Sequence, residues 1–80
     1  MIDKILNSYN TSSLVIAKGY DNAVIGIDVD SERIIYSIRK CLEILVALGL
    51  NEDESVDYLQ NNTMNEYTGN NRPIWCDDIF

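Results

Sequence analysis

Several kinds of residue and pattern are missing from this chain of 80 residues, and each absence excludes a class of function. The chain has no histidine, no run of glycines and no cluster of cysteines. Histidine is the common acid–base group near neutral pH, glycine-rich loops bind phosphates, and clustered cysteines bind zinc. We therefore expect no catalytic residue, no cofactor and no bound metal.

Positive charge is scarce as well. Six Lys and Arg residues stand against thirteen Asp and Glu residues, and the formal net charge is −7. Binding to nucleic-acid phosphates and to anionic membranes depends on Lys and Arg. We therefore expect neither nucleic acid nor a membrane to be a direct partner.

Long apolar runs are also missing. No run is long enough to span a membrane, and the residues after Met1 form a short amphipathic stretch rather than a signal peptide. Cys41 lies in an apolar run and Cys76 lies near the end, far apart in the sequence. We expect a cytoplasmic protein with reduced thiols, in which the sequons at Asn10 and Asn61 are coincidental.

The apolar content that remains is sufficient for one small domain. Hydrophobic residues make up 46% of the chain, which is typical of a folded protein. We expect a single domain over residues 1–80, with an N-terminal arm or helix at 1–18, a core module at 19–76 and a tail at 77–80. So short a chain buries a limited core, so a protein partner or a homodimer would help to cover its apolar surface.

The first half of the chain predicts a short helix and a β-hairpin. Apolar residues at helical spacing predict a helix over residues 2–9, which the polar residues 10–13 end. Residues 14–17 form an apolar run that fits either a strand or a buried arm. Two β-rich runs, 23–27 and 33–36, flank a polar turn and predict the hairpin.

Two helices are predicted after the hairpin. Ser37 is a suitable N-cap for the first helix and Gly49 a suitable residue just after its end. Asn51 and Glu54 predict a capping box at the start of the second helix. The apolar stripe of the first helix extends over more than one face, and its residues are Ile38, Cys41, Leu42, Ile44, Leu45, Val46, Ala47 and Leu48.

The tail around Pro73 is predicted to be extended, because proline is confined to the edge of a sheet or to an arm. The predicted fold class is α+β: a β-hairpin followed by two packed α-helices and an extended C-terminal tail, with a short N-terminal helix. We expect the hairpin to pack on the first helix, with Leu45 in the core.

One segment resembles an active site. Asp28 and Asp30 follow a predicted strand, as in the nucleophile motif of haloacid-dehalogenase-like phosphatases, but that fold needs a doubly wound sheet that eighty residues cannot supply. With Glu32, the same acids resemble the start of a calcium loop that lacks its central Gly and closing Glu. We interpret the segment as a turn. A small metal-binding, ligand-binding or enzymatic module built on Asp28 and Asp30 is the alternative.

Negative charge is concentrated near the C-terminus. Residues 1–50 have a net charge of −1 and residues 51–80 a net charge of −6. Acids at the start of the second helix favour the positive end of its dipole, and they are also able to steer a basic partner; a solubility role is the other interpretation. These acids are Glu52, Asp53, Glu54 and Asp57.

Trp75 adds an aromatic side chain to this part of the chain, together with Tyr67 and Phe80. Trp and Tyr are frequent anchors of protein interfaces. In so small a domain, Trp75 is also suited to close the core over the two helices, and this second interpretation is the one we favour.

A set of short motifs resembles a family of small proteins common in phage and prophage genomes. The motifs are Gly19–Gly26, Arg33–Ser37, a helix through Cys41–Leu45, and the pattern Tyr67-x-Gly69-x-x-x-Pro73-Ile74-Trp75. They cover residues 19–76 and are specific as a set rather than singly. The resemblance implies a viral setting; the family has no agreed activity, so it implies no mechanism and no catalytic residue.

Together these features predict a small acidic protein of phage type that acts by protein–protein interaction. The expected partner is a host or phage protein with a basic surface, bound to modify a host machine or to block a defence system. The predicted partner-binding residues are Glu52, Asp53, Glu54, Asp57 and Trp75. A third interpretation is a DNA mimic, but a mimic spreads acids along an extended face, whereas asparagine occurs nine times in this polar sequence.

Overall fold

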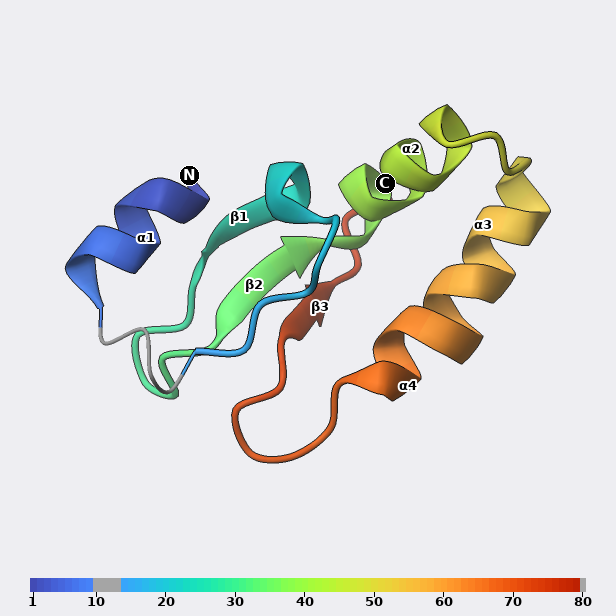
Figure 1. The fold of residues 1–80 in the computed structure, drawn as a ribbon. Helices are drawn as coiled ribbons and strands as arrows, with labels where there is room; N and C mark the ends of the chain where they lie inside the picture. Colours follow the sequence, from blue (N-terminus) through green and yellow to red (C-terminus); the bar gives the residue numbers. More distant parts are fainter. Residues whose placement is uncertain (10–13, 80) are drawn as a thin grey trace.

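A three-stranded sheet with the strand order β1-β2-β3 organises the fold (Figure 1). The computed structural model describes residues 1–9 and 14–79. Strands β1 (Val24–Ile27) and β2 (Ile34–Ser37) are antiparallel, which confirms the predicted hairpin. The extended tail also conforms to prediction, and three of its residues pair with β2 as the parallel edge strand β3 (Ile74–Cys76).

A β-bulge decides which side chains of the hairpin share a face. Val24 pairs with Tyr36 and Ile27 pairs with Ile34, because the register shifts by one residue just after Val24. The four side chains therefore lie on one face of the sheet, although Val24 and Ile27 are three residues apart. On this face Tyr36 is 0% exposed, Ile34 1% and Val24 4%. It is the face that forms the core.

Helix α1 (Ile2–Ser8) and helix α2 (Ile38–Ala47) were both expected from the sequence. The Ser37 side chain caps α2 by accepting a hydrogen bond from the Lys40 amide at 3.0 Å. At the other end Gly49 has a φ of 111°, and the Gly49 and Leu50 amides donate back to α2 carbonyls. This paired termination is the Schellman arrangement, which favours glycine at that position. Leu45 is 4% exposed, so its predicted place in the core is confirmed.

The second predicted helix is observed as three consecutive segments: α3 (Glu52–Tyr58), the π-helical turn η3 (Leu59–Thr63) and α4 (Met64–Glu66). Both hydrogen bonds of the predicted Asn51–Glu54 capping box are present. The wider π turn was not predicted. It leaves Leu59 and Thr63 both buried, and the Thr63 hydroxyl bonds the Tyr20 hydroxyl at 2.9 Å.

Residues 14–17 form an arm rather than a strand, and Figure 1 shows this segment crossing the sheet. Ala17 is completely buried, and its amide donates to the Tyr36 hydroxyl at 2.9 Å. The one-turn 3₁₀ helix η2 (Asp21–Ala23) then leads into β1. The predicted break at residues 10–13 and the sequon at Asn10 lie outside the described residues. No helix in the described part of the chain is long and apolar enough to cross a membrane.

Candidate protein-interaction site

The four predicted acids lie on α3 and all are exposed. Glu54 has a structural role, because its carboxylate accepts the Asn51 amide at 3.0 Å while its own amide donates to Asn51 Oδ1 at 2.8 Å. Within the described residues, no hydrogen bond or ion pair engages the carboxylates of Glu52, Asp53 or Asp57. Three of the four acids are therefore solvated charges whose field extends outward from α3.

The acids do not share one side of the helix. Glu52 lies toward α2, whereas Glu54 and Asp57 border a shallow depression beside Tyr58, whose side chain is 46% exposed. Acidic side chains therefore lie on two sides of α3, and the surface next to them differs between the two sides.

Trp75 lies away from these acids, in the sheet. Its backbone is paired with Tyr36, and the two rings are 5.3 Å apart between centroids with an interplanar angle of 31°. The indole is partly buried and packs against the core. Trp75 lines neither the hollow at Glu52 nor the depression at Glu54 and Asp57. The described contacts therefore join Trp75 to the core rather than to the acidic part of the predicted site.

The Asp28 segment forms a turn that uses its own polar groups. One oxygen of the Asp28 carboxylate accepts the Ser31 hydroxyl at 2.6 Å and the Ser31 amide at 3.1 Å, and these bonds lower the pKa of Asp28. Glu32 completes the turn with a φ of 55°. Across residues 1–9 and 14–79, no three Asp, Glu, Cys or His side chains are grouped as metal ligands.

Neither cysteine is in a disulfide, and Cys41 is buried in the core. Burial raises the pKa of the Cys41 thiol to about 12. A thiol with so high a pKa is almost wholly protonated at neutral pH and is a poor nucleophile. Cys41 is therefore a packing residue, as its apolar sequence context indicates.

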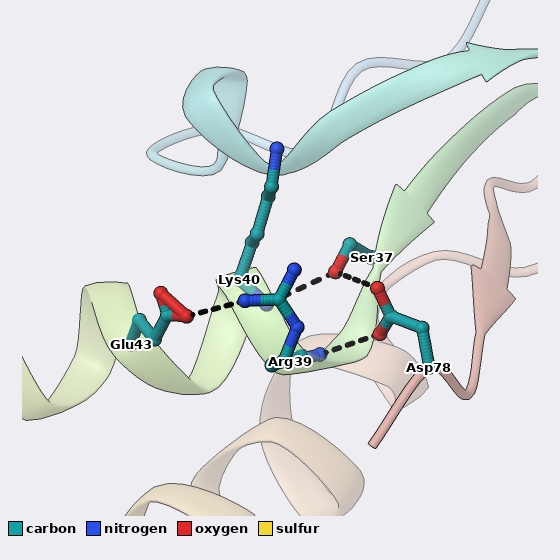
Figure 2. A network of polar contacts seen from close by, with 5 residues as sticks. All are labelled: Ser37, Arg39, Lys40, Glu43 and Asp78. Carbon is teal, nitrogen blue, oxygen red and sulfur yellow. Dashed lines mark hydrogen bonds and ion pairs between the residues drawn. The ribbon is translucent and has the colours of Figure 1, made fainter. Parts of the chain in front are cut away.

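Asp78 forms a polar network that the sequence did not predict (Figure 2). Its carboxylate accepts the Ser37 hydroxyl at 2.5 Å and the Arg39 amide at 2.9 Å, at the N-terminus of α2. These two hydrogen bonds lower the pKa of Asp78, and the bond from Ser37 has the larger effect. The Arg39 side chain turns to Glu43, one helical turn away, at 2.9 Å. The network fixes the end of the chain to the start of α2.

A groove runs between α2 and α3 beside this anchored tail. Its volume is about 620 Å³, and it is termed here the α2–α3 groove. Its apolar lining comes from both helices and from the tail, and consists of Leu42, Val46 and Ala47 of α2, Val56 of α3 and Ile79. Charged side chains border it, namely Arg39, Glu43 and Glu52.

Only one predicted site residue, Glu52, lies at this groove. The sequence feature that indicates the groove is the apolar stripe of α2. This stripe is too wide for one buried face and leaves Val46 and Ala47 outside the core. The opposing wall on α3 and the tail residue Ile79 could not be inferred from that stripe. They depend on how residues distant in the sequence meet.

Comparisons of the chain with protein families, with curated proteins and with solved structures find no match.

Proposed function

We propose that this protein acts by binding a partner protein with a basic surface, and that the acids of α3 steer the encounter. The observation that supports this proposal is the set of exposed carboxylates of Glu52, Asp53 and Asp57, which no group of the described residues engages, with Glu52 at the rim of the apolar groove. Like charges gathered on one surface element raise the rate of encounter with an oppositely charged partner. The apolar groove that Glu52 borders supplies the short-range contacts that retain a partner after encounter.

The setting we propose is that of a small phage-type protein in the cytoplasm of a host cell. The motif set over residues 19–76 supports this setting by its resemblance to phage and prophage proteins. The partner is then a host or phage protein, and binding modifies a host machine or blocks a defence system. We propose no enzymatic activity and no cofactor.

The proposal is tested by capture followed by kinetics. The tagged protein is used to capture a partner from a bacterial lysate, and the association rate of the purified pair is measured at about 20 mM and about 200 mM salt, where screening differs strongly. A triple variant, Glu52→Lys, Asp53→Lys and Asp57→Lys, is compared with wild type. At low salt we expect association to slow by roughly tenfold or more.

A matched variant separates local charge from net charge. Asp3→Lys, Asp21→Lys and Asp30→Lys reverse three other exposed acids and change the net charge by the same amount. Because these positions lie outside α3, the control should associate at close to the wild-type rate. Equal slowing by both triple variants, or slowing by neither, would show that the acids of α3 have no special part in binding.

A further inference from the structure

We infer that the α2–α3 groove is a docking site for a partner's amphipathic segment, in which apolar side chains are flanked by Lys or Arg. This inference rests on the proposed function and deepens it, since it specifies the chemistry of the segment that is bound. The acids of α3 account for encounter, whereas the groove accounts for retention.

The molecule is slightly more extended than an average domain of its size. Its radius of gyration is 12.5 Å, against about 11.6 Å expected for a compact chain of this length. Its accessible surface is 5284 Å², against about 4,900 Å² expected for its mass. Both values agree with the elongated shape of the molecule, whose principal extents are 36 × 23 × 23 Å.

Exposed apolar side chains cluster at the groove. Val46 is 44% exposed, Val56 38% and Ile79 52%, and all three line the same groove. Leu42 and Ala47 complete its apolar lining. Contiguous exposed apolar surface is typical of interaction sites, and a volume of about 620 Å³ is in the usual range of binding pockets. The groove accommodates a few side chains rather than a whole domain face.

Local hydrogen bonds define the walls of the groove in the free chain. The paired termination at Gly49 ends α2, and the Asn51–Glu54 capping box starts α3, so the short link between the helices has a defined conformation. Asp78 bonds Ser37 and the Arg39 amide, which holds neighbouring Ile79 at the groove. A preformed groove loses less conformational entropy on binding than one that must be ordered.

The charges at the rim select the kind of segment that fits. Arg39 is already paired with Glu43 at 2.9 Å, so its positive charge is compensated within α2. Glu52, on the opposite rim, has no such pair among the described residues, and Asp53 follows it on α3. A segment whose apolar residues are flanked by Lys or Arg complements both the groove and this rim.

A second copy of the chain is a poorer occupant. Each chain has a net charge of −7, so pairing through the acidic rim would place like charges together. Such juxtaposition is destabilising, whereas a basic segment gains from the same charges. The structure therefore favours a partner of opposite charge over self-association at this groove.

The test uses a fluorescent probe peptide in which Leu recurs every three to four positions among Lys residues. A second peptide has Ser in place of each Leu and the same charge. We expect the Leu peptide to bind the wild-type protein at least about tenfold more tightly than the Ser peptide. Backbone NMR shifts on titration should be largest along α2 and α3, around Leu42, Val46 and Val56.

Paired variants locate the binding site. Val46→Ser with Val56→Ser removes two exposed groove side chains, and Val29→Ser with Leu48→Ser removes two that are each 76% exposed and lie outside the groove. Because all four positions are exposed, both double variants should fold, which circular dichroism checks. The groove variant should bind the Leu peptide roughly tenfold or more weakly, and the control within about twofold of wild type.

Other outcomes overturn the inference in distinct ways. If both peptides bind wild type equally, or if the groove variant binds like the control, the groove is not the docking site, and the role of the α3 acids stands or fails separately. If the groove variant loses binding while charge reversal on α3 has no effect, the groove binds apolar side chains, but the basic flanks of the segment and the steering role are wrong. A dimer in sedimentation that Val46→Ser with Val56→Ser dissociates would identify a second copy as the occupant.

Discussion

The core around Tyr36 and the α2–α3 groove are built from the same kinds of aliphatic residues, yet only the first is closed. The core is covered by segments distant in sequence: the arm at Ala17 and the π turn at Thr63 both reach it, and each brings a polar partner for a buried tyrosine hydroxyl. The groove has two helices and a short tail around it, and no such cover among the described residues. Closure in this fold thus depends on long-range contacts, and where they are missing an apolar surface remains for a partner.

The neighbouring residues Leu45 and Val46 give the sharpest contrast between the two regions. Leu45 is 4% exposed in the core and Val46 is 44% exposed in the groove. Leu45→Ala should lower the free energy of unfolding by about 2–5 kcal/mol, since it leaves a cavity. Val46→Ala should change it by less than about 0.5 kcal/mol. Urea denaturation measures both, and similar losses would mean that the groove is part of the core.

The tyrosine hydroxyls extend the comparison to polar groups. Tyr36→Phe leaves the buried Ala17 amide without its partner, which should cost about 1–3 kcal/mol of stability. The matched change Tyr67→Phe removes a bond to the Lys18 amide, which is exposed and able to bond water instead. It should cost a small fraction of that amount. Urea denaturation of the two variants measures the loss of stability in each. Equal losses would show that the arm is not tightly packed on the sheet.

Asp78 should contribute a smaller, pH-dependent stabilisation. Its pKa is lowered from an ordinary value of 3.8 by hydrogen bonds from Ser37 and the Arg39 amide. A carboxyl with a lowered pKa stabilises the fold above its unfolded pKa, and the contribution disappears as the pH falls through the folded pKa. Asp78→Asn should therefore lower the urea midpoint at pH 7 and lower it less at pH 2.

The exposed neighbour Asp77 supplies the control for this prediction. Asp77→Asn removes an equal charge from the same segment, and it should leave the urea midpoint close to the wild-type value at both pH values. If Asp77→Asn and Asp78→Asn have the same effect at pH 7, the anchoring of the tail at α2 is wrong.

The turn at Asp28 and Asp30 should give the smallest effect of all. We predict that it binds no metal ion when the protein is titrated with one. The Asp28 carboxylate is engaged by Ser31, and no further ligand joins it within the described residues. Calorimetry with Mg²⁺ or Ca²⁺ should therefore give no specific heat of binding. Micromolar binding that Asp30→Asn abolishes would instead support the metal-binding or enzymatic alternative.

Sequence reasoning succeeded where the interacting residues are close together in the chain. The Ser37 cap, the Gly49 termination and the Asn51–Glu54 capping box each involve partners a few residues apart, and all are observed. The sequence patterns that predict the hairpin and the helices also involve residues that are close together in the chain. These signals were sufficient for the fold class and for the order of its elements.

Features that join distant residues were not predictable in this way. Asp78 caps a helix that begins forty residues earlier in the chain, at Ile38. Nothing near Asp78 in the sequence distinguishes it from the exposed acids of the chain. The pairing of β3 with β2 and the two walls of the groove also depend on contacts between residues that are distant in the sequence. The candidate site was therefore predictable as an acidic helix, but not as the groove beside it.

The most direct test of the proposed interaction surface is hydrogen–deuterium exchange of the whole chain, alone and with the captured partner. We predict that binding slows exchange along α2 and α3, over residues 38–58, while exchange in the hairpin at residues 24–37 is unchanged. Slower exchange confined to the hairpin, with α2 and α3 exchanging as in the free protein, would contradict the account and place the interface on the sheet.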